Sequence, residues 1–252
     1  MTPEINTATN ASIMLWVMHR FSVVFKEHAI LKGGMQLMLL SSHRATNDLD
    51  YVFSPFKSKK EVERDIESIL GELNGAKIEK SMHSNTGRFI ISFGKANVQI
   101  EFNVSLQTKS EALSTQQLAS SVGAIPKVIR VMASDVALSH KLAAWNERRL
   151  LRDLYDVHFW HSTIGATPDM ETLNQRLSSI NSRLPKLKGK KKMSLSELCE
   201  ELEKSLGNLD ERTFKIQLEP LIPKEHIDGH FLIFKASIKS FIDKLRIKGS
   251  KK

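Results

Sequence analysis

Two aspartates separated by one residue, with a glycine pair upstream, are the residues most suited to chemistry. Gly33-Gly34 is followed after thirteen residues by Asp48-Leu49-Asp50, and Asp50 opens the apolar run Tyr51-Val52-Phe53 that is typical of a strand. Side chains at i and i+2 of a strand point to one face, so both carboxylates can share divalent metal ions. Magnesium prefers oxygen ligands and keeps substrate phosphates in its shell. The pattern therefore indicates phosphoryl transfer from a nucleotide, in which catalysis is mainly positioning and electrostatic stabilisation by a metal.

A third acid and a phosphate-binding turn complete this arrangement. In the β-like stretch from Asn97 to Val104, apolar residues alternate with polar ones, so Glu101 is predicted on the polar face. There it is our candidate for the third ligand of a two-metal clamp, although a glutamate on a half-exposed strand is also an ordinary surface residue. The turn at Gly33-Gly34, which leads into a helix, is expected to offer backbone N–H groups to a nucleotide phosphate.

A second charged cluster lies further along the chain. On a continuous helix through residues 133–160, four residues are spaced by seven, four and four positions and share one face: Lys141, Arg148, Arg152 and Asp156. Such a cationic stripe would neutralise a triphosphate. The alternative is an exposed helix with i,i+4 pairs, Arg152–Asp156 and Arg149–Asp153, each worth a few tenths of a kcal/mol.

These residues resemble a known signature. The stretch from Leu31 to Leu37, followed by the stretch from Arg44 to Tyr51, is similar to that of the AbiEii/AbiGii-type toxins. These are nucleotidyltransferases of the polymerase-β superfamily, found as the toxic half of bacterial toxin–antitoxin and phage-defence pairs. The segment Lys141-Leu142-Ala143-Ala144, with Arg148 and the run from Arg152 to Asp156, resembles the same family. The similarity covers roughly residues 28–160, and the residues that follow show only a helical, basic character.

The resemblance implies roles for individual residues. It assigns metal binding to Asp48 and Asp50, and a further catalytic aspartate to either Asp153 or Asp156. Lys141 is expected to contact the triphosphate and to take part in catalysis. The expected nucleotide-binding residues are Lys32, Gly33, Gly34, Arg44, Thr46, Lys141, Arg148 and Arg152. Two positions depart from the superfamily pattern: Gly34 stands where serine is common, and Glu101 stands where aspartate is commoner.

The order of the elements predicts an α+β fold with two domains. Helical spacing is seen in residues 12–27, 35–40 and 59–73, and strand-like patterns in residues 29–31, 49–53, 77–82, 88–93 and 97–104. From about residue 133 the pattern is helical, with a charged linker at 185–192 and further helices at 194–206 and 229–246. We therefore expect a polymerase-β-like nucleotidyltransferase core, a mixed sheet flanked by helices, in residues 1–130, and a helical domain with basic segments in residues 131–252.

Composition and charge narrow the class of protein. The 252 residues carry a net charge of +9, which favours polyanionic partners. Ten basic residues near the C-terminal end are candidates for phosphate contacts: Lys186, Lys188, Lys190, Lys191, Lys192, Lys244, Arg246, Lys248, Lys251 and Lys252. The single cysteine excludes an internal disulfide, and no apolar run is long enough for a secretory signal or a membrane span. A cytoplasmic location is expected.

The sequence thus predicts an NTP-dependent, two-metal nucleotidyltransferase toxin. It is expected to use Mg²⁺, to transfer NMP to an RNA acceptor, with tRNA as the expected acceptor, and to be neutralised by an antitoxin protein. One alternative is a nucleotidyltransferase that modifies a small molecule or a protein, for which a strongly basic face is unnecessary. The other is a non-catalytic module that binds nucleotide or RNA, against which the intact Asp48 and Asp50 argue.

Overall fold

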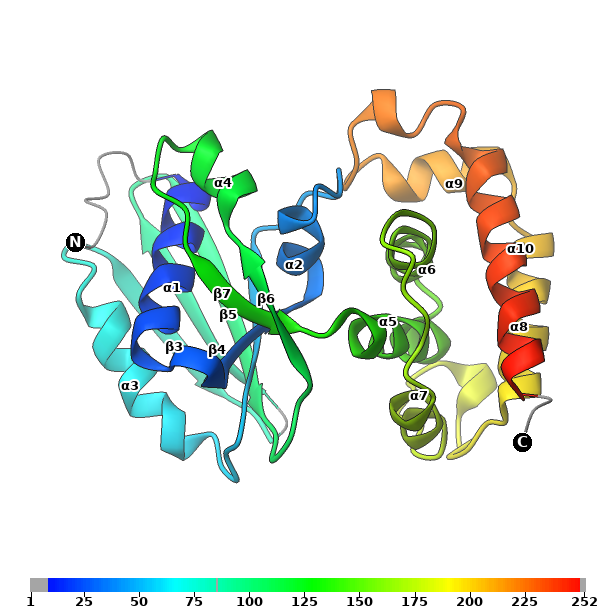
Figure 1. Ribbon diagram of the computed structural model, residues 1–252, viewed down its shortest axis with the longest axis horizontal. Helices are drawn as coiled ribbons and strands as arrows, with labels where there is room; N and C mark the ends of the chain where they lie inside the picture. Colours follow the sequence, from blue (N-terminus) through cyan, green and yellow to red (C-terminus); the bar gives the residue numbers. More distant parts are fainter. Residues whose placement is uncertain (1–8, 85, 250–252) are drawn as a thin grey trace. The chain divides into compact units, whose positions relative to one another are not determined.

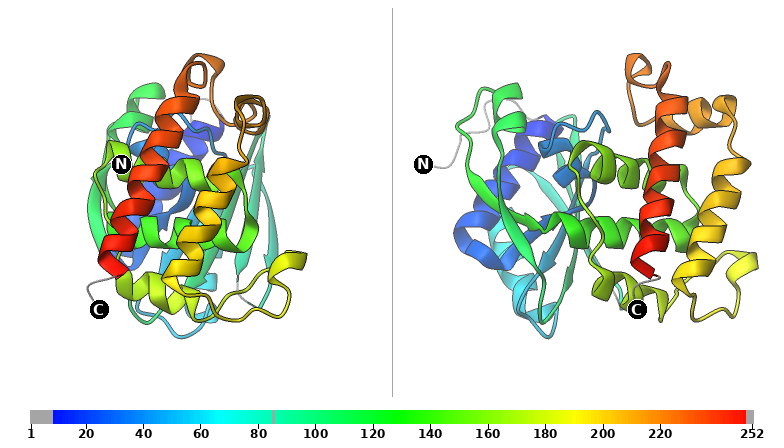
Figure 2. Two further views of the ribbon diagram at one scale, coloured as in Figure 1. Left: turned by 90° about the vertical axis from the view of Figure 1, so that its right-hand side faces the viewer. Right: turned by 45° about the vertical axis from the view of Figure 1, so that its right-hand side comes forward.

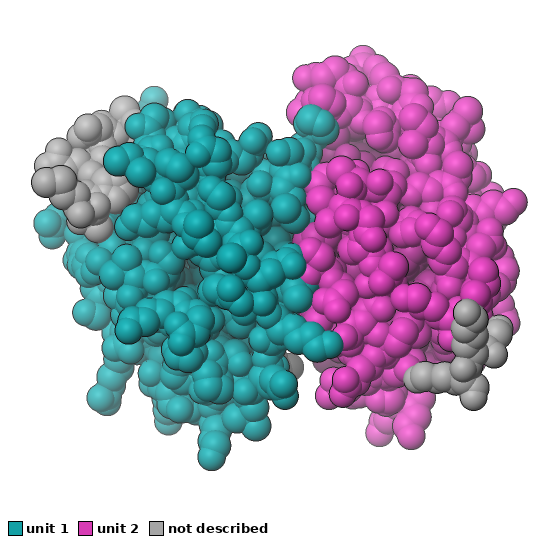
Figure 3. Space-filling view, in the orientation of Figure 1, with its two compact units in different colours: residues 1–133 teal, residues 134–252 magenta. Residues whose placement is uncertain are grey.

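The structure is a computed structural model that describes residues 9–84 and 86–249. The chain divides into two compact units, Met1–Ala133 and Ser134–Lys252, coloured teal and magenta in Figure 3. The first unit carries a β-sheet, and the described part of the second is helical (Figure 1).

The sheet of the first unit is mixed. In the part of the chain that the structure describes, seven strands hydrogen-bond in the order β3-β4-β5-β2-β1-β7-β6. The β2–β5 and β1–β7 pairs are parallel, and the other neighbours are antiparallel. The strands are β1 (Ala29–Lys32), β2 (Asp48–Phe53), β3 (Lys77–Met82), β4 (Gly87–Phe93), β5 (Ala96–Val104), β6 (Ser110–Ser114) and β7 (Val128–Met132).

One face of this sheet forms the core of the unit. Figures 1 and 2 show α1 and α3 on that face, and α1 contacts β5, β7 and α3. Tyr51, Phe53 and Phe102 point toward the helices and are buried with Phe21. The helices of this unit are α1 (Asn10–Val24), the 3₁₀ turn η1 (Lys26–His28), α2 (Gly33–Leu39), α3 (Lys60–Gly71) and α4 (Gln116–Ser121).

The opposite face of the sheet is polar. On β2, Leu49 is buried whereas Asp48 is exposed and Asp50 is half-buried. On β5, Ile100 is buried and Glu101 is half-buried, so the predicted alternation of this strand is confirmed. The chemistry-bearing side chains therefore stand on the face of the sheet that the core does not use.

Three elements of the first unit lie in segments whose residue pattern predicts neither a helix nor a strand. These are the edge strand β6, the short helix α4 and the strand β7. The β6 segment reads Ser-Glu-Ala-Leu-Ser, which is too polar and short for the alternation of a half-buried strand. β7 becomes recognisable only through its parallel pairing with β1, a contact between segments about a hundred residues apart.

The second unit is built from helices. α10 packs against α8 and α6, and α5 packs against α6 and α7. Trp145 and Trp160 are fully buried. The elements are α5 (Ser134–Arg148), α6 (Leu151–His158), the π-helical turn η2 (Phe159–Thr163), α7 (Met170–Leu177), the 3₁₀ turn η3 (Pro185–Leu187), α8 (Leu195–Gly207), α9 (Glu211–Leu218), the 3₁₀ turn η4 (Lys224–His226) and α10 (His230–Gly249).

The prediction of a continuous helix through residues 133–160 is wrong. The chain breaks between α5 and α6 at Arg149, which has a φ of 56°. Its guanidinium donates to the backbone oxygen of Asn146 and lies over the ring of Trp145, which offsets the cost of this left-handed conformation. Because of the break, residues on the two sides do not share one helical face.

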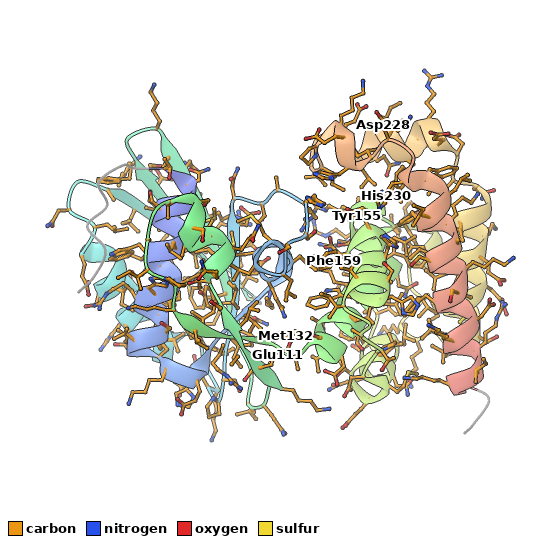
Figure 4. All side chains as sticks on the ribbon, turned by 45° about the horizontal axis from the view of Figure 1, so that its top comes forward. Glu111, Met132, Tyr155, Phe159, Asp228 and His230 are labelled. Atoms are coloured by element: carbon orange, nitrogen blue, oxygen red, sulfur yellow. The ribbon has the colours of Figure 1, made fainter. Side chains whose placement is uncertain are left out.

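His158 ties α6 to α10. Its ring lies edge-on to the rings of Phe234 and His230, and the ring centroids of His158 and His230 are 6.1 Å apart. Figure 4 labels His230 and, near it, Tyr155. Burial, and to a lesser extent the neighbouring His230 and His161, lowers the pKa of His158 to about 4. The histidine is therefore a neutral packing residue of the helical unit.

Candidate active site

The glycine pair joins β1 to α2 and lies against the carboxylate strand. Lys32 is the last residue of β1. Gly33 follows it with a φ of 78°, a backbone conformation that residues other than glycine rarely adopt. A Cβ at Gly33 would also overlap Oδ2 of Asp50. Position 33 therefore needs glycine for two reasons: the turn into α2 and the close approach of its backbone to Asp50.

Gly34 makes room for two other predicted residues. A Cβ at Gly34 would lie 2.5 Å from Nη1 of Arg44 and 3.1 Å from Oγ1 of Thr46. The space that a serine would occupy in related enzymes is thus taken by a guanidinium and a hydroxyl from the loop before β2. Thr46 Oγ1 also accepts a hydrogen bond of 3.3 Å from the backbone N–H of Asp48, which links this loop to the carboxylates.

The two aspartates and a lysine form the centre of the site. Asp48 and Asp50 lie on the polar face of β2, and β1 pairs with β2 so that Lys32 is opposite Asp50. The Lys32 Nζ lies 4.0 Å from Asp50 Oδ1, and both side chains are about 30% exposed. The cation is thus close to the carboxylate while both remain open to a ligand.

Glu101 continues this row across the sheet. It lies on β5 opposite Asp50, and Arg88 on β4 lies opposite Glu101. Arg88 donates to Glu101 Oε1 through Nε at 3.1 Å and Nη2 at 2.6 Å, and Gln99 Nε2 donates to the same oxygen at 3.1 Å. Among the described residues no donor reaches the other carboxylate oxygen, Oε2. Glu101 is therefore oriented through one oxygen and offers the other.

These donors suit a divalent metal, although they do not form a complete cage. Within residues 9–84 and 86–249, no three Asp, Glu, His or Cys side chains are grouped as the ligands of a metal ion. The chain instead offers the carboxylates of Asp48 and Asp50, with Glu101 on the adjacent strand. Hard oxygen donors of this kind fit magnesium, which commonly takes one or two protein carboxylates and completes its shell with water and substrate phosphates.

The second predicted cluster lies within the helical unit. Lys141 Nζ on α5 lies 2.6 Å from Oδ2 of Asp156 on α6, whose side chain is fully buried. Arg148 holds Asp153 with two hydrogen bonds, of 2.6 and 3.1 Å. Burial raises the pKa of the Asp153 carboxyl despite the opposing effect of Lys141 and Arg148. Both aspartates are therefore fixed by cations across the α5–α6 break.

The ion pairs of this cluster differ from those predicted for an exposed helix. The i,i+4 pairs Arg152–Asp156 and Arg149–Asp153 are not the ones formed, because the break at Arg149 changes which side chains meet. Arg149 pairs with Glu201 of α8 instead. Arg152 is exposed, and no described residue accepts a hydrogen bond from its guanidinium or forms an ion pair with it.

Two contacts of the site were missed in the sequence. Arg88 and Gln99 hold Glu101, but neither belongs to a motif. Arg88 precedes Phe89 and Ile91, which point into the core, so the alternation of β4 places Arg88 on the polar face. That signal was present, but the register that sets Arg88 opposite Glu101 depends on tertiary structure.

The mixed sheet flanked by helices is the core fold expected of a nucleotidyltransferase of the polymerase-β type. The chain belongs to the AbiEii family of such enzymes, because the family described as "Nucleotidyl transferase AbiEii toxin, Type IV TA system" matches residues 16–228. The resemblance seen in the sequence is thereby confirmed. The protein is thus a nucleotidyltransferase toxin of a type IV toxin–antitoxin system, and the family implies an NTP substrate and an antitoxin partner.

Comparison with solved structures agrees on the fold. The chain is similar to MenT4, a nucleotidyltransferase toxin from Mycobacterium tuberculosis H37Rv, with a TM-score of 0.60 and 14% sequence identity. The match covers 94% of this chain and 84% of that one. No curated protein matches the sequence. None of the described helices combines the length and apolar character needed to cross a membrane.

Proposed function

We propose that the chain transfers a nucleoside monophosphate from an NTP to an RNA acceptor, with tRNA as the acceptor class and Mg²⁺ as the metal. The observation that carries this proposal is the close approach of Gly33 to Asp50 beside Lys32. A backbone without a side chain, a cation and a carboxylate meet there, and phosphate bound through a metal needs these three features. The catalytic role belongs to residues 1–130, and acceptor binding to the helical, basic residues 131–252.

Asp48 and Asp50, with Glu101 as the third candidate, supply the carboxylate oxygens for the metal. When bound, Mg²⁺ neutralises charge on the phosphate oxygens of the NTP. In the transfer, the acceptor hydroxyl forms a bond to the α-phosphorus, and the bond from that phosphorus to the bridging β-oxygen breaks. Pyrophosphate leaves with the electron pair, and the hydroxyl proton passes to a carboxylate of the Asp48/Asp50 pair.

The remaining candidates bind and orient the triphosphate. Lys32 is a point charge next to Asp50, and Arg44 and Thr46 supply a guanidinium and a hydroxyl beside Gly34. In the helical unit we assign phosphate contacts to Lys141, Arg148 and Arg152. We assign a further catalytic role to either Asp153 or Asp156. The exposed guanidinium of Arg152 is available for such a contact, whereas Lys141 and Arg148 hold the aspartates.

Charge supports RNA as the acceptor. The net charge of +9 favours a polyanion, and the side chains of Lys188, Lys191 and Lys192 are exposed before α8. Other members of the predicted basic segments have structural partners: Lys190 with Glu197, and Arg246 with Glu203. The Lys186 side chain, Lys251 and Lys252 lie outside what the structure describes.

The acceptor can be tested by incubating the purified protein with Mg²⁺, total RNA, total protein and each labelled NTP in turn. We expect label on RNA of tRNA size. Label on protein or on a small molecule, with RNA unlabelled, would contradict the proposed acceptor and favour the alternative nucleotidyltransferase. The same reactions with Mg²⁺ replaced by EDTA should give no product, and undiminished labelling would contradict the proposed metal.

A further inference from the structure

A cavity of about 580 Å³ lies entirely within the helical unit. It is formed by the segment Leu184 to Met193, the second half of α8 and Arg149 at the α5–α6 break; Figure 2 draws that segment yellow before α8. Its volume is in the range of small-ligand sites, about 300–1,000 Å³. None of the residues assigned above to the metal, to the NTP or to catalysis lines it. The cavity is therefore a separate candidate for binding.

The wall of the cavity carries an excess of positive charge. Its cations are Arg149, Lys190 and Lys204, whereas Glu201 is its acid. Glu201 pairs with Arg149 at 3.0 Å. Lys204 is exposed, and its ammonium has neither a hydrogen bond nor an ion pair with any described residue. At least one cation at the rim is thus available to an anionic ligand.

The rest of the wall is largely apolar. Leu187 and Met193 are buried, and they share the wall with half-buried or exposed apolar side chains and two neutral polar ones: Leu184, Pro185, Leu209, Ser205 and Asn208. The Asn208 amide can both donate and accept hydrogen bonds. A ligand that matches this wall has a flat, weakly polar body as well as a negative charge. A nucleotide has both, in its base and its phosphate.

We propose that this cavity binds one nucleotide of a single-stranded segment of RNA. The phosphate contacts Lys204 and Arg149, and the base lies against the apolar wall beside Asn208. This inference deepens the proposed function, on which it rests for the choice of RNA among polyanions. The cavity then positions the acceptor through the helical unit.

The test is the affinity of the full-length protein for a short, fluorescently labelled single-stranded oligoribonucleotide, measured by anisotropy over a range of salt. Lys204→Glu should weaken binding about tenfold and make the salt dependence shallower by about one phosphate contact. Glu201→Gln should strengthen binding, because it removes the acid and releases Arg149. Lys95→Glu is the matched control: it changes the net charge by the same amount, on an exposed turn that does not line the cavity.

Equal losses in Lys204→Glu and Lys95→Glu would overturn the proposal, because they would reflect overall charge alone. Unchanged binding in Lys204→Glu would also overturn it. So would equal displacement of the labelled RNA by polyglutamate and by unlabelled RNA, when the two competitors are compared at the same concentration of negative charge. The two proposals fail separately. If Lys204→Glu labels RNA and binds RNA with unaltered affinity, the cavity is not an RNA site, although the proposed function stands. If RNA binding depends on Lys204 but the native protein labels no RNA, RNA is not the acceptor of the transfer.

Discussion

At the scale of the residue, Gly33 is the position where the sequence motif and the geometry meet most closely. Its φ of 78° favours glycine, and its backbone approaches Asp50 so closely that a Cβ would overlap the carboxylate. The first property concerns stability, since a left-handed alanine costs about 1–2 kcal/mol. The second concerns activity, because Asp50 would have to move.

We therefore expect Gly33→Ala to abolish nucleotidyl transfer while costing only about 1–2 kcal/mol of stability. Gly123→Ala is the matched control in the same unit. Gly123 has a φ of 65°, but its Cβ would meet nothing within 4 Å. It should lose similar stability in urea unfolding and keep its transfer rate. Equal rates for the two variants would contradict the role given to the contact between Gly33 and Asp50.

Gly34 is a departure from the superfamily pattern. Serine is common at this position in the superfamily, so this chain lacks the hydroxyl that a serine would supply. The structure fills that space with Arg44 and Thr46, both from the loop before β2. A guanidinium and a hydroxyl therefore stand beside the glycine turn, and the departure does not leave the turn without polar groups.

At the scale of the element, a charged row crosses four adjacent strands. It runs from Lys32 on β1 through Asp50 and Glu101 to Arg88 on β4. If Oε2 of Glu101 binds metal, Glu101→Gln should raise the Mg²⁺ concentration needed for half-maximal transfer about tenfold or more. Arg88→Ala should shift it in the same direction by less, because it only releases Oε1.

The control for this pair is Lys80→Ala on the edge strand β3, whose ammonium pairs with Glu63 and Glu67 of α3 and touches none of the row. Transfer rates measured over a magnesium titration distinguish the three variants. An unchanged magnesium requirement in Glu101→Gln would show that Glu101 is not a ligand, and the metal would then depend on Asp48 and Asp50 alone.

The contact of α6 with α10 makes the helical unit sensitive to acid. His158 titrates near pH 4 in the native state and near 6.5 when unfolded, so the unfolded state binds more protons between these values. The contribution of neutral His158 to the free energy of unfolding is therefore fully present above about pH 6.5. It is lost as the pH falls toward 4, by up to about 3 kcal/mol. His158→Gln should remove this loss.

Hydrogen exchange of the α6 and α10 amides between pH 6.5 and 4.5 measures the effect. The α1 amides beside His19 are the internal reference, because burial lowers the pKa of His19 to about 4 as well and that histidine is unchanged. A His158→Gln protein with the same pH dependence in α10 as the native protein would contradict the assignment.

Sequence patterns predicted the elements that carry the site better than those that surround it. Strands with buried aromatic residues, such as the one ending at Phe53, have a period that the sequence makes visible. Arg149 in a left-handed conformation has no such local signal, because only its contacts with Asn146, Trp145 and Glu201 stabilise it. The pairs Lys141–Asp156 and Arg148–Asp153 follow from that break, so they too were missed.

At the scale of the whole molecule, the chain combines a compact unit that contains the β-sheet with a compact helical unit. The sheet unit contains the carboxylates, and the helical unit contains the buried aspartates and the basic cavity. Membership of the AbiEii family fixes the reaction class as nucleotidyl transfer. We propose that Asp48 and Asp50 are the residues on which this transfer depends.

Incorporation of labelled nucleotide into RNA by three matched variants shows whether transfer depends on Asp48 and Asp50. Asp48→Asn and Asp50→Asn remove one charge each from the proposed metal pair, and Asp65→Asn removes the same charge from an exposed position on α3. We expect the first two to lose transfer by at least about a thousandfold while binding RNA normally, and Asp65→Asn to retain the native rate. Native rates in both Asp48→Asn and Asp50→Asn would contradict the account.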